Sequence, residues 1–248
     1  MGQADYGQTN TIQTMNILVL DTSTERAVIG IGGQSGSRHA TTTDGMRRHG
    51  SDLIPKLAAT LRDAGLTSRD IHVIGVGLGP GSYTGLRVGL TAAKALAYVT
   101  GASLLGLDSL EAVARNAPAE SPRISVIVDA QRGLVYIADF IRESTAGPLL
   151  RRRATRIEPL LGWLDRLEPE TLVLGPGLLS PRIQCALPAS MLTQNHALNY
   201  PDGERLLELA IQTWASGHRD DPLLIEPNYL RQSSAEELWD KRHPRKTD

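Results

Sequence analysis

A buried strand, a glycine-rich turn and a helix without a polar face follow one another over residues 71–99. IHVIGVGLG (71–79) is an apolar run that ends in glycines, as expected for a buried strand. From Leu86 to Val99 the next segment has helical character and carries only two charges, Arg87 and Lys94. A helix that is apolar on all sides is buried on all sides. It must therefore pack on its own sheet and against something else, either a second subunit or the rest of one large lobe.

Strands come before helices in both halves of the chain. The expected strands cover residues 17–21, 26–33, 38–43, 71–79, 102–107, 123–130, 134–141 and 171–175. The expected helices cover residues 51–65, 86–99, 108–117, 157–167 and 203–217, with Ser51 or Asp52, Ser82 or Thr84, and Asp108 as caps. This order predicts the α/β class. The strand–turn–strand unit at 123–141 repeats the one at 17–33, which indicates two related lobes.

The same pattern suggests how the chain is divided. Pro118 and Pro122 bracket the expected boundary between the lobes. We expect a disordered N-terminal extension, an N-terminal lobe, a C-terminal lobe and a C-terminal segment with a charged tail, at residues 1–14, 15–117, 118–226 and 227–248. Met15 is a candidate alternative start.

Composition narrows the class of protein. The 248 residues carry a net charge of −1, without the basic excess that is typical of nucleic-acid binders. Cys185 is the single cysteine, so no intrachain disulfide can form, which fits a reducing compartment. No apolar run reaches the ~18 residues of a membrane span, and the polar N-terminus lacks the features of a secretory signal. The expected location is the cytoplasm, away from membranes.

Two hydroxyl-rich turns are candidates for binding a nucleotide. DTSTE (21–25) follows a strand, and its backbone amides could hold phosphate oxygens while the carboxylate orients a magnesium-bound water. GPGSYTG (79–85) precedes a helix N-terminus, which favours anions. The alternatives are a plain β-turn and a tight strand–helix connection. The candidate nucleotide-binding residues are Asp21, Thr22, Ser23, Thr24, Gly79, Gly81 and Ser82.

Other chemistry has weaker support in the sequence. The six histidines form neither an H-E-x-x-H motif nor an i, i+4 pair, so no metal site is expected. The basic run RRRATR (151–156) is typical of a solvated loop, and a contact with RNA is the alternative.

Several motifs in a fixed order resemble one family. MNILVLDTSTERAVIGI, RRHGSDLIPKLAATL, GLGPGSYTGLRVGLTAAKALA, VDAQRGLVYIADF and EPNYLR…AEELW span residues 15 to about 240. In this order they resemble the TsaB (YeaZ) family of the bacterial tRNA threonylcarbamoyladenosine machinery. The resemblance implies the actin-like ATPase (ASKHA, ribonuclease H-like) fold, with two lobes of duplicated ancestry.

The resemblance also implies a function without catalysis by this chain. Family members bind and activate a TsaD-type transferase, which modifies the adenosine next to the tRNA anticodon, together with a TsaE-type ATPase. The transferase has an N-H-x-x-G-H metal motif, and here Ser109 and Val113 stand where its two histidines would be. Neither residue replaces a histidine as a metal ligand. The resemblance implies that the chain contacts tRNA only indirectly, through the complex. Whether ATP or ADP binds with magnesium at a subunit interface is left open.

The resemblance places the partner interface on the helices at 51–64 and 85–99, with a homodimer when the chain is alone. The expected interface residues are Leu53, Leu57, Leu61, Leu86, Val88, Gly89, Leu90, Ala93, Leu96 and Ala97. Two other functions compete with this hypothesis. One is an autonomous ATP-dependent enzyme such as a small-molecule kinase, and the other is a metallopeptidase, which the absent ligands disfavour.

Overall fold

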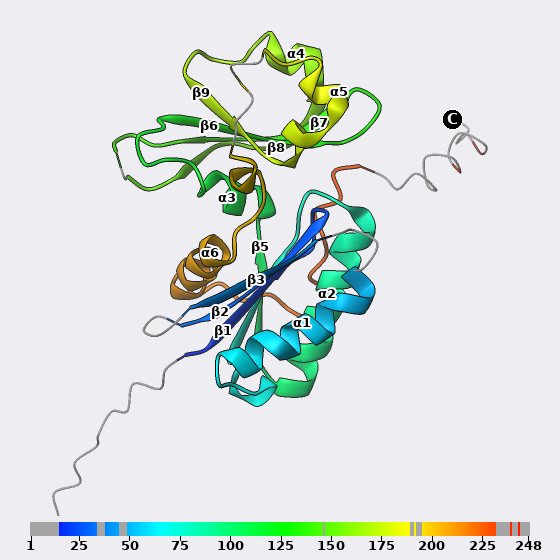
Figure 1. Cartoon of the computed structure of the whole chain (residues 1–248), viewed down its shortest axis with the longest axis vertical. Helices are drawn as coiled ribbons and strands as arrows, with labels where there is room; N and C mark the ends of the chain where they lie inside the picture. Colours follow the sequence, from blue (N-terminus) through cyan, green and yellow to red (C-terminus); the bar gives the residue numbers. More distant parts are fainter. Residues whose placement is uncertain are drawn as a thin grey trace, which may run out of the picture.

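The chain forms two lobes, each built on its own sheet (Figure 1). A computed structural model describes residues 15–33, 38–44, 49–145, 147–188, 191, 195–231, 239 and 243. The expected disorder of residues 1–14 and most of the expected tail after Arg231 lie outside these described residues.

The first sheet has five strands in the order β3-β2-β1-β4-β5. Its strands are β1 (Ile17–Asp21), β2 (Arg26–Gly32), β3 (His39–Asp44), β4 (Val73–Gly77) and β5 (Ser103–Leu107). β1 pairs antiparallel with β2 and parallel with β4, and β4 pairs parallel with β5. The short DTSTE turn can only join antiparallel neighbours, whereas a helix must connect the parallel ones.

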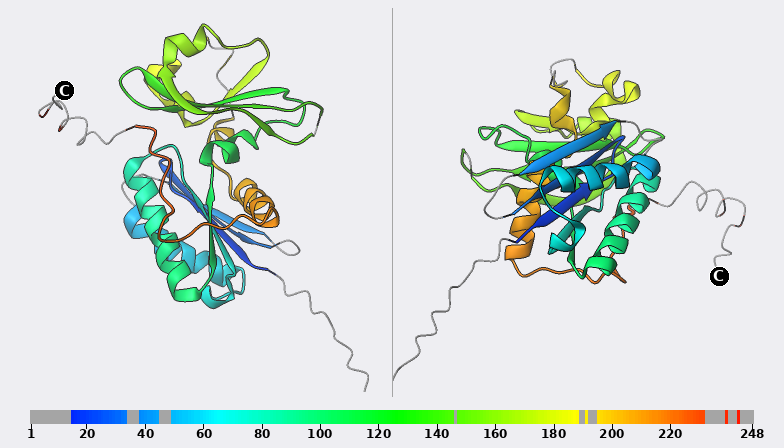
Figure 2. Two further views of the ribbon diagram at one scale, coloured as in Figure 1. Left: turned by 180° about the vertical axis from the view of Figure 1, so that it is seen from behind. Right: turned by 60° about the horizontal axis from the view of Figure 1, so that its bottom comes forward.

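Helices cover both faces of the first sheet. The helices α1 (His49–Asp63) and α2 (Tyr83–Thr100) lie on one face, and α6 (Gly203–Ala215) lies on the other (Figure 2). Side chains alternate along β1, so Leu18 and Leu20 pack under α1 and α2, while Ile17 and Val19 pack under α6. A strand that is buried on both faces has no polar alternation, which explains the continuous apolar run ILVL.

The second sheet repeats the topology of the first four strands. Its order is β8-β7-β6-β9, with β6 (Arg123–Asp129), β7 (Leu134–Ile141), β8 (Leu150–Pro159) and β9 (Thr171–Leu174). β6 pairs antiparallel with β7 and parallel with β9, as β1 does with β2 and β4. The repeated topology confirms the expected α/β fold with two lobes of duplicated ancestry.

The remaining elements are short. They are η2 (Ser68–Asp70), α3 (Ser109–Ala114), α4 (Leu160–Leu164), η3 (Pro176–Leu179), α5 (Pro181–Gln184) and η5 (His196–Asn199), where η marks a 3-10 helix. Among the described residues, no helix is long and apolar enough to cross a membrane.

Helix α6 belongs structurally to the first sheet, although it follows the second sheet in the sequence. Leu206, Leu207 and Ala210 pack against residues of β1, β2 and β5. We expected residues 118–226 to form the C-terminal lobe, and this helix departs from that division. An amphipathic pattern shows that a helix is covered but not which sheet covers it. The boundary near residue 118 stays a prediction.

Two local expectations were wrong. The basic run 151–156 is not a loop, because it forms most of the edge strand β8. The helix expected over 157–167 is only the five-residue α4, because residues 157–159 extend β8 beside β7. Three consecutive arginines are atypical of a strand, so the pairing with β7 overrides local propensity.

The start of α1 also differs from the expectation. The helix begins at His49, so Ser51 and Asp52 lie inside its first turn instead of capping it. At the other helices Ser82 accepts a hydrogen bond from the Gly85 amide, and Asp108 accepts bonds from two amides of α3, as expected for caps.

Candidate functional site between the lobes

The turn after β1 is packed directly against the glycine-rich turn before α2. The Ser82 amide donates to the Ser23 carbonyl oxygen at 2.7 Å, and the Thr22 hydroxyl donates to the Gly85 carbonyl oxygen at 2.7 Å. The side chains of residues 21–24 are all buried, with exposed fractions between 0% and 7%. The two candidate phosphate turns therefore bond to each other.

The glycines of the second turn make this close approach possible. A Cβ atom on Gly81 would lie 2.2 Å from the Ser23 carbonyl oxygen, and one on Gly85 would lie 2.0 Å from that of Thr22. A Cβ atom on Gly89 would lie 2.2 Å from the Thr22 hydroxyl. Removing the side chain is the way to bring two backbones this close. At these positions the glycines make room for the DTSTE turn of the same chain. This packing corresponds to the alternative of a tight strand–helix connection.

A buried hydrogen-bond network ties Asp21 to α3. The Ser109 hydroxyl donates to Oδ2 of Asp21 at 2.6 Å and accepts from the Gly79 amide at 2.9 Å. Oδ1 of Asp21 accepts from the Ser23 amide at 2.8 Å. Asp21 is fully buried, so both of its carboxylate oxygens are satisfied inside the protein.

The two positions that correspond to metal-binding histidines have structural roles here. Ser109 is 1% exposed and belongs to the network with Asp21. Val113 is 1% exposed and packs in the core of the second lobe. Within the described ranges, no group of three or more His, Cys, Asp or Glu side chains could hold a metal ion.

A cleft of about 820 Å³ lies between the lobes. Its lining comes from the segments 23–25, 80–87, 128–131, 176–180 and 228–231. Among the candidate nucleotide-binding residues, Ser23, Thr24, Gly81 and Ser82 line the cleft, whereas Asp21, Thr22 and Gly79 are buried and do not. The volume is in the range of small-molecule sites.

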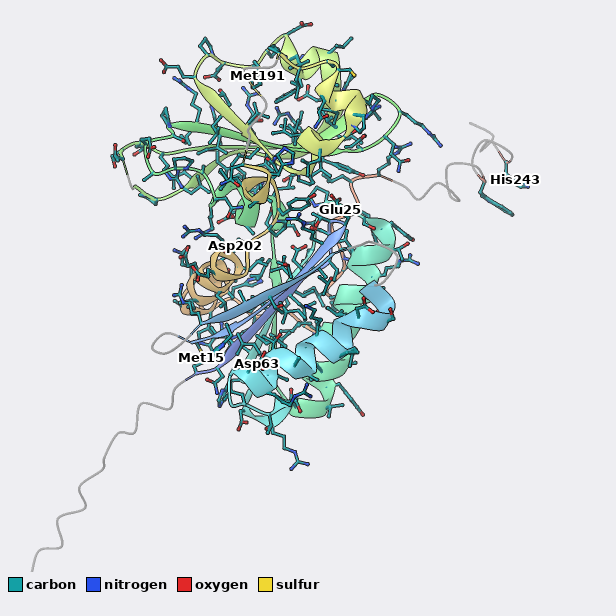
Figure 3. All side chains as sticks on the ribbon, viewed as in Figure 1. Met15, Glu25, Asp63, Met191, Asp202 and His243 are labelled. Carbon is teal, nitrogen blue, oxygen red and sulfur yellow. The ribbon has the colours of Figure 1, made fainter. Side chains whose placement is uncertain are left out.

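Carboxylates at the cleft are already engaged. Glu25 lies where the first lobe faces the second (Figure 3), and it accepts a hydrogen bond from the Tyr200 hydroxyl. Asp129 accepts from the Ser180 hydroxyl at 2.8 Å and forms an ion pair with Arg182. A magnesium ion in the cleft would compete with these partners for the carboxylate oxygens.

The cleft includes a C-terminal segment that our candidate list missed. The Asn228 amide donates to the Leu78 carbonyl oxygen at 2.9 Å, next to the glycine-rich turn. The Tyr229 ring lies 4.9 Å from the Tyr83 ring, and its hydroxyl accepts from Nε of Arg87 at 3.1 Å. Arg87, the basic residue that follows the glycine-rich turn, thus bonds to the hydroxyls of two tyrosines. The EPNYLR motif was the available signal, but sequence spacing does not reveal contact over 142 positions.

The carboxylate of Asp108, the N-cap of α3, is subject to two opposing electrostatic effects. Oδ1 of Asp108 accepts from the Leu110 and Glu111 amides, and Oδ2 pairs with Arg151 of β8 at 2.7 Å. Burial raises the pKa of the Asp108 carboxyl above its ordinary value, and the attraction of Arg151 opposes this shift. The first basic residue of the 151–156 run therefore joins β8 to α3.

Comparison with known proteins places the chain in a family. It is 30% identical over 230 residues to the tRNA threonylcarbamoyladenosine biosynthesis protein TsaB of Bacillus subtilis, covering 91% of this chain and 98% of that protein. The chain belongs to the TsaB family. The TsaB protein of Escherichia coli (strain K12) is 26% identical over 92% of this chain and 98% of its own length.

Two further comparisons agree with membership of the TsaB family. Residues 41–162 match the family model described as "TsaD: tRNA N6-adenosine threonylcarbamoyltransferase". The solved structure of YeaZ from Pseudomonas aeruginosa has a TM-score of 0.70 at 23% identity, over 86% of this chain and 99% of that one. The structural likeness confirms the fold.

Most residues expected at a partner interface of this TsaB-family chain lie in the core of its first lobe. Leu53, Leu57, Leu61, Leu86, Gly89, Leu90, Ala93 and Ala97 are buried, and Val88 and Leu96 are half-buried. Eight of these ten positions therefore face the sheet or the neighbouring helix of the same chain. The expectation assigned the apolar stripe of each helix to a partner, but that stripe is what covers the first sheet.

A different stripe of α2 faces outward. After Arg87 the exposed positions of this helix are Thr91, Ala95, Tyr98 and Val99, and none of them is charged. Tyr98 is 91% exposed and Val99 is 79% exposed. This uncharged outer stripe lies opposite the face that α2 buries on the first sheet.

Proposed function

We propose that the chain is a non-catalytic subunit that binds and activates a TsaD-type transferase in the formation of N6-threonylcarbamoyladenosine next to the tRNA anticodon. The observation that carries this proposal is the uncharged outer stripe of α2. A solvated helix face normally carries charged side chains, and their absence over Thr91, Ala95, Tyr98 and Val99 favours a covered face.

The chemistry of the stripe suits a helix–helix contact. Thr91 and Ala95 are small, so another helix can approach α2 closely at its middle. Tyr98 and Val99 extend beyond them near the end of α2. A buried tyrosine contributes a large apolar area and keeps a polar group for the rim, which is why such residues are enriched at interfaces. The same stripe would serve a second copy of the chain, so homodimer and heterocomplex exclude each other.

The buried network supports an accessory role over catalysis. In the described part of the chain, Ser109 and Val113 occupy core positions and no metal-ligand cluster is present. A metallopeptidase would need such a cluster. Under this proposal the TsaD-type partner carries out the transfer step, with a TsaE-type ATPase as the third component.

Reconstitution tests the proposal. Threonylcarbamoyl transfer to tRNA is measured with TsaD-type and TsaE-type proteins from the same organism, with and without this chain. We expect transfer to depend on the chain, and Tyr98→Glu to reduce both association and transfer. Undiminished transfer in the absence of the chain would contradict the proposal. Leu161→Glu, which places the same carboxylate at a 67% exposed apolar position of α4 in the second lobe, is the matched control.

The cleft between the lobes is the observation that favours a second function, that of an autonomous ATP-dependent kinase. Its volume could hold ATP or ADP with magnesium, as an autonomous kinase would require. The engaged state of Asp21, Glu25 and Asp129 gives this function less support. Calorimetry with ATP and magnesium on the isolated chain separates the two functions. Binding with turnover favours the kinase, and binding without turnover favours a structural nucleotide.

A further inference from the structure

A basic hollow of about 360 Å³ lies on the second lobe, apart from the cleft and from α2. Five arginines from three segments line it: Arg123 of β6, Arg152, Arg153 and Arg156 of β8, and Arg166 after α4. The run RRRATR supplies three of them because it is a strand, and the sheet brings Arg123 beside them from 29 positions earlier in the sequence. Both Arg123 and Arg152 pair with Glu168.

The hollow has more positive than negative charge. Three carboxylates pair with its arginines, namely Glu168, Asp139 and Glu158. Five guanidinium groups against three carboxylates leave an excess of two positive charges, in a chain whose net charge is −1. This excess is local, so the overall composition conceals it.

Arg153 carries one of the unbalanced charges. It lies opposite Asp139 in the β7–β8 register, but Arg156 takes that carboxylate at 2.7 Å. Arg153 is exposed, and its side chain forms no hydrogen bond or ion pair with the described residues. The neighbouring Arg152 and Arg123 are 40% and 42% exposed, and each guanidinium has more donors than its pairing with Glu168 uses.

We propose that this hollow, formed by Arg123, Arg152, Arg153, Arg156 and Arg166, docks the phosphate backbone of RNA. Planar guanidinium groups match phosphate oxygens in bidentate geometry, and their spread over three segments suits a chain of phosphates. The two aromatic residues in the lining, Phe140 and Trp163, are 1% and 2% exposed, so neither offers a surface for stacking a base. The contact is therefore to the backbone and independent of base sequence.

The location of the hollow allows RNA and a protein partner to bind together. β8, α4 and β9 lie in the second lobe, whereas α1 and α2 lie beside the first sheet (Figure 1). A partner on the outer stripe of α2 would leave the hollow open. The inference rests on the family's role in tRNA modification and changes the expected contact with tRNA from indirect to direct.

Binding of a fluorescent unmodified tRNA to the full-length isolated chain, followed by anisotropy over a series of salt concentrations, tests the inference. The variants are Arg153→Glu and Arg69→Glu, which change the net charge equally. Arg69 is an exposed arginine of η2 in the first lobe, and its side chain likewise forms no hydrogen bond or ion pair with the described residues. Thermal melts of both variants should match the unaltered chain, because neither arginine supports the fold.

We expect Arg153→Glu to weaken binding roughly tenfold at low salt and to reduce the slope of log K against log salt by about one, as loss of a phosphate contact does. Arg69→Glu should remain within about twofold of the unaltered chain. Equal affinities for the two variants, or no tRNA binding by the unaltered chain at low salt, would overturn the inference. The assay contains no transferase, so its failure leaves the proposed partner role standing.

Discussion

The Ser109 hydroxyl donates a 2.6 Å hydrogen bond to Oδ2 of the fully buried Asp21 and accepts one from the Gly79 amide. One side chain thus joins the end of β1, the glycine-rich turn and the start of α3. In the N-H-x-x-G-H motif of the TsaD-type transferase, a histidine stands at the corresponding position. Here the serine closes a network that stabilises the junction of three segments.

Ser109→Ala should lower the free energy of unfolding by about 1–3 kcal/mol, because it leaves a buried carboxylate oxygen and a buried amide without partners. Urea unfolding measures the loss. Ser68→Ala is the control, since the side chain of Ser68 forms no hydrogen bond with the described residues, and it should change stability by less than about 0.5 kcal/mol. Similar values for the two variants would mean that the network contributes little.

Gly85→Ala should destabilise the fold by about 1–3 kcal/mol or more, although alanine is the better helix former. The reason is that a Cβ atom would lie 2.0 Å from the Thr22 carbonyl oxygen. Gly50→Ala is a matched change at a position of α1 with no atom within 4 Å, and it should be neutral or stabilising by up to about 1 kcal/mol. Thermal melts compare the two. A Gly85→Ala protein as stable as the unaltered chain would contradict this close packing and would favour the hypothesis that the glycine-rich turn binds a phosphate.

Ala93→Glu and Tyr98→Glu should separate core from surface on the same helix. Ala93 is 0% exposed on the buried face of α2, so a glutamate there carries a buried unpaired charge and should unfold the first lobe at a cost of several kcal/mol. Tyr98 is 91% exposed, so its variant should melt like the unaltered chain. Size-exclusion chromatography of the folded Tyr98→Glu protein should then show weakened self-association or partner binding. Unchanged association would remove the outer stripe as an interface.

Arg151→Met should destabilise the protein more at neutral pH than in acid. Burial raises the pKa of Asp108, so its contribution to stability is greatest in acid and is lost as the pH rises through the raised pKa. Without the attraction of Arg151 the pKa of Asp108 rises further. We expect ionised Asp108 to cost about 1–3 kcal/mol more at pH 7, a value between those of exposed and buried ion pairs. Below about pH 4, where the carboxyl is neutral, most of this difference should disappear.

Urea unfolding at several pH values measures this dependence, with Arg62→Met at an exposed position of α1 as the control. Arg151 also lies over the Phe140 ring at 4.7 Å, and methionine keeps much of that packing. A loss that is equal at all pH values would assign the role of Arg151 to packing on Phe140 instead of to its charge.

Local patterns were enough to predict the core strands and the duplication. ILVL, VIGVG and SVIV have apolar runs that only buried strands explain, and the turns DTSTE and QRG follow directly from their spacing. Repetition of the strand–turn–strand unit indicated two related lobes without knowledge of any contact. Ser82 and Asp108 were recognised as caps because capping depends on residues three positions away or fewer.

The sequence by itself determined that α2 is packed on its own sheet, and its shortage of charged residues predicted a second contact, because a helix that is apolar on all sides is normally buried on all sides. Only the tertiary structure decided which side chains face each neighbour: Leu90 and Ala93 face the first sheet, and Tyr98 and Val99 face outward. It also decided that Gly81 and Gly85 make room for the protein's own turn, and that RRRATR is a strand whose carboxylate partners include Asp108, Asp139 and Glu168. Periodicity is a property of neighbouring residues, whereas these contacts join residues tens of positions apart and exist only once the sheets have formed.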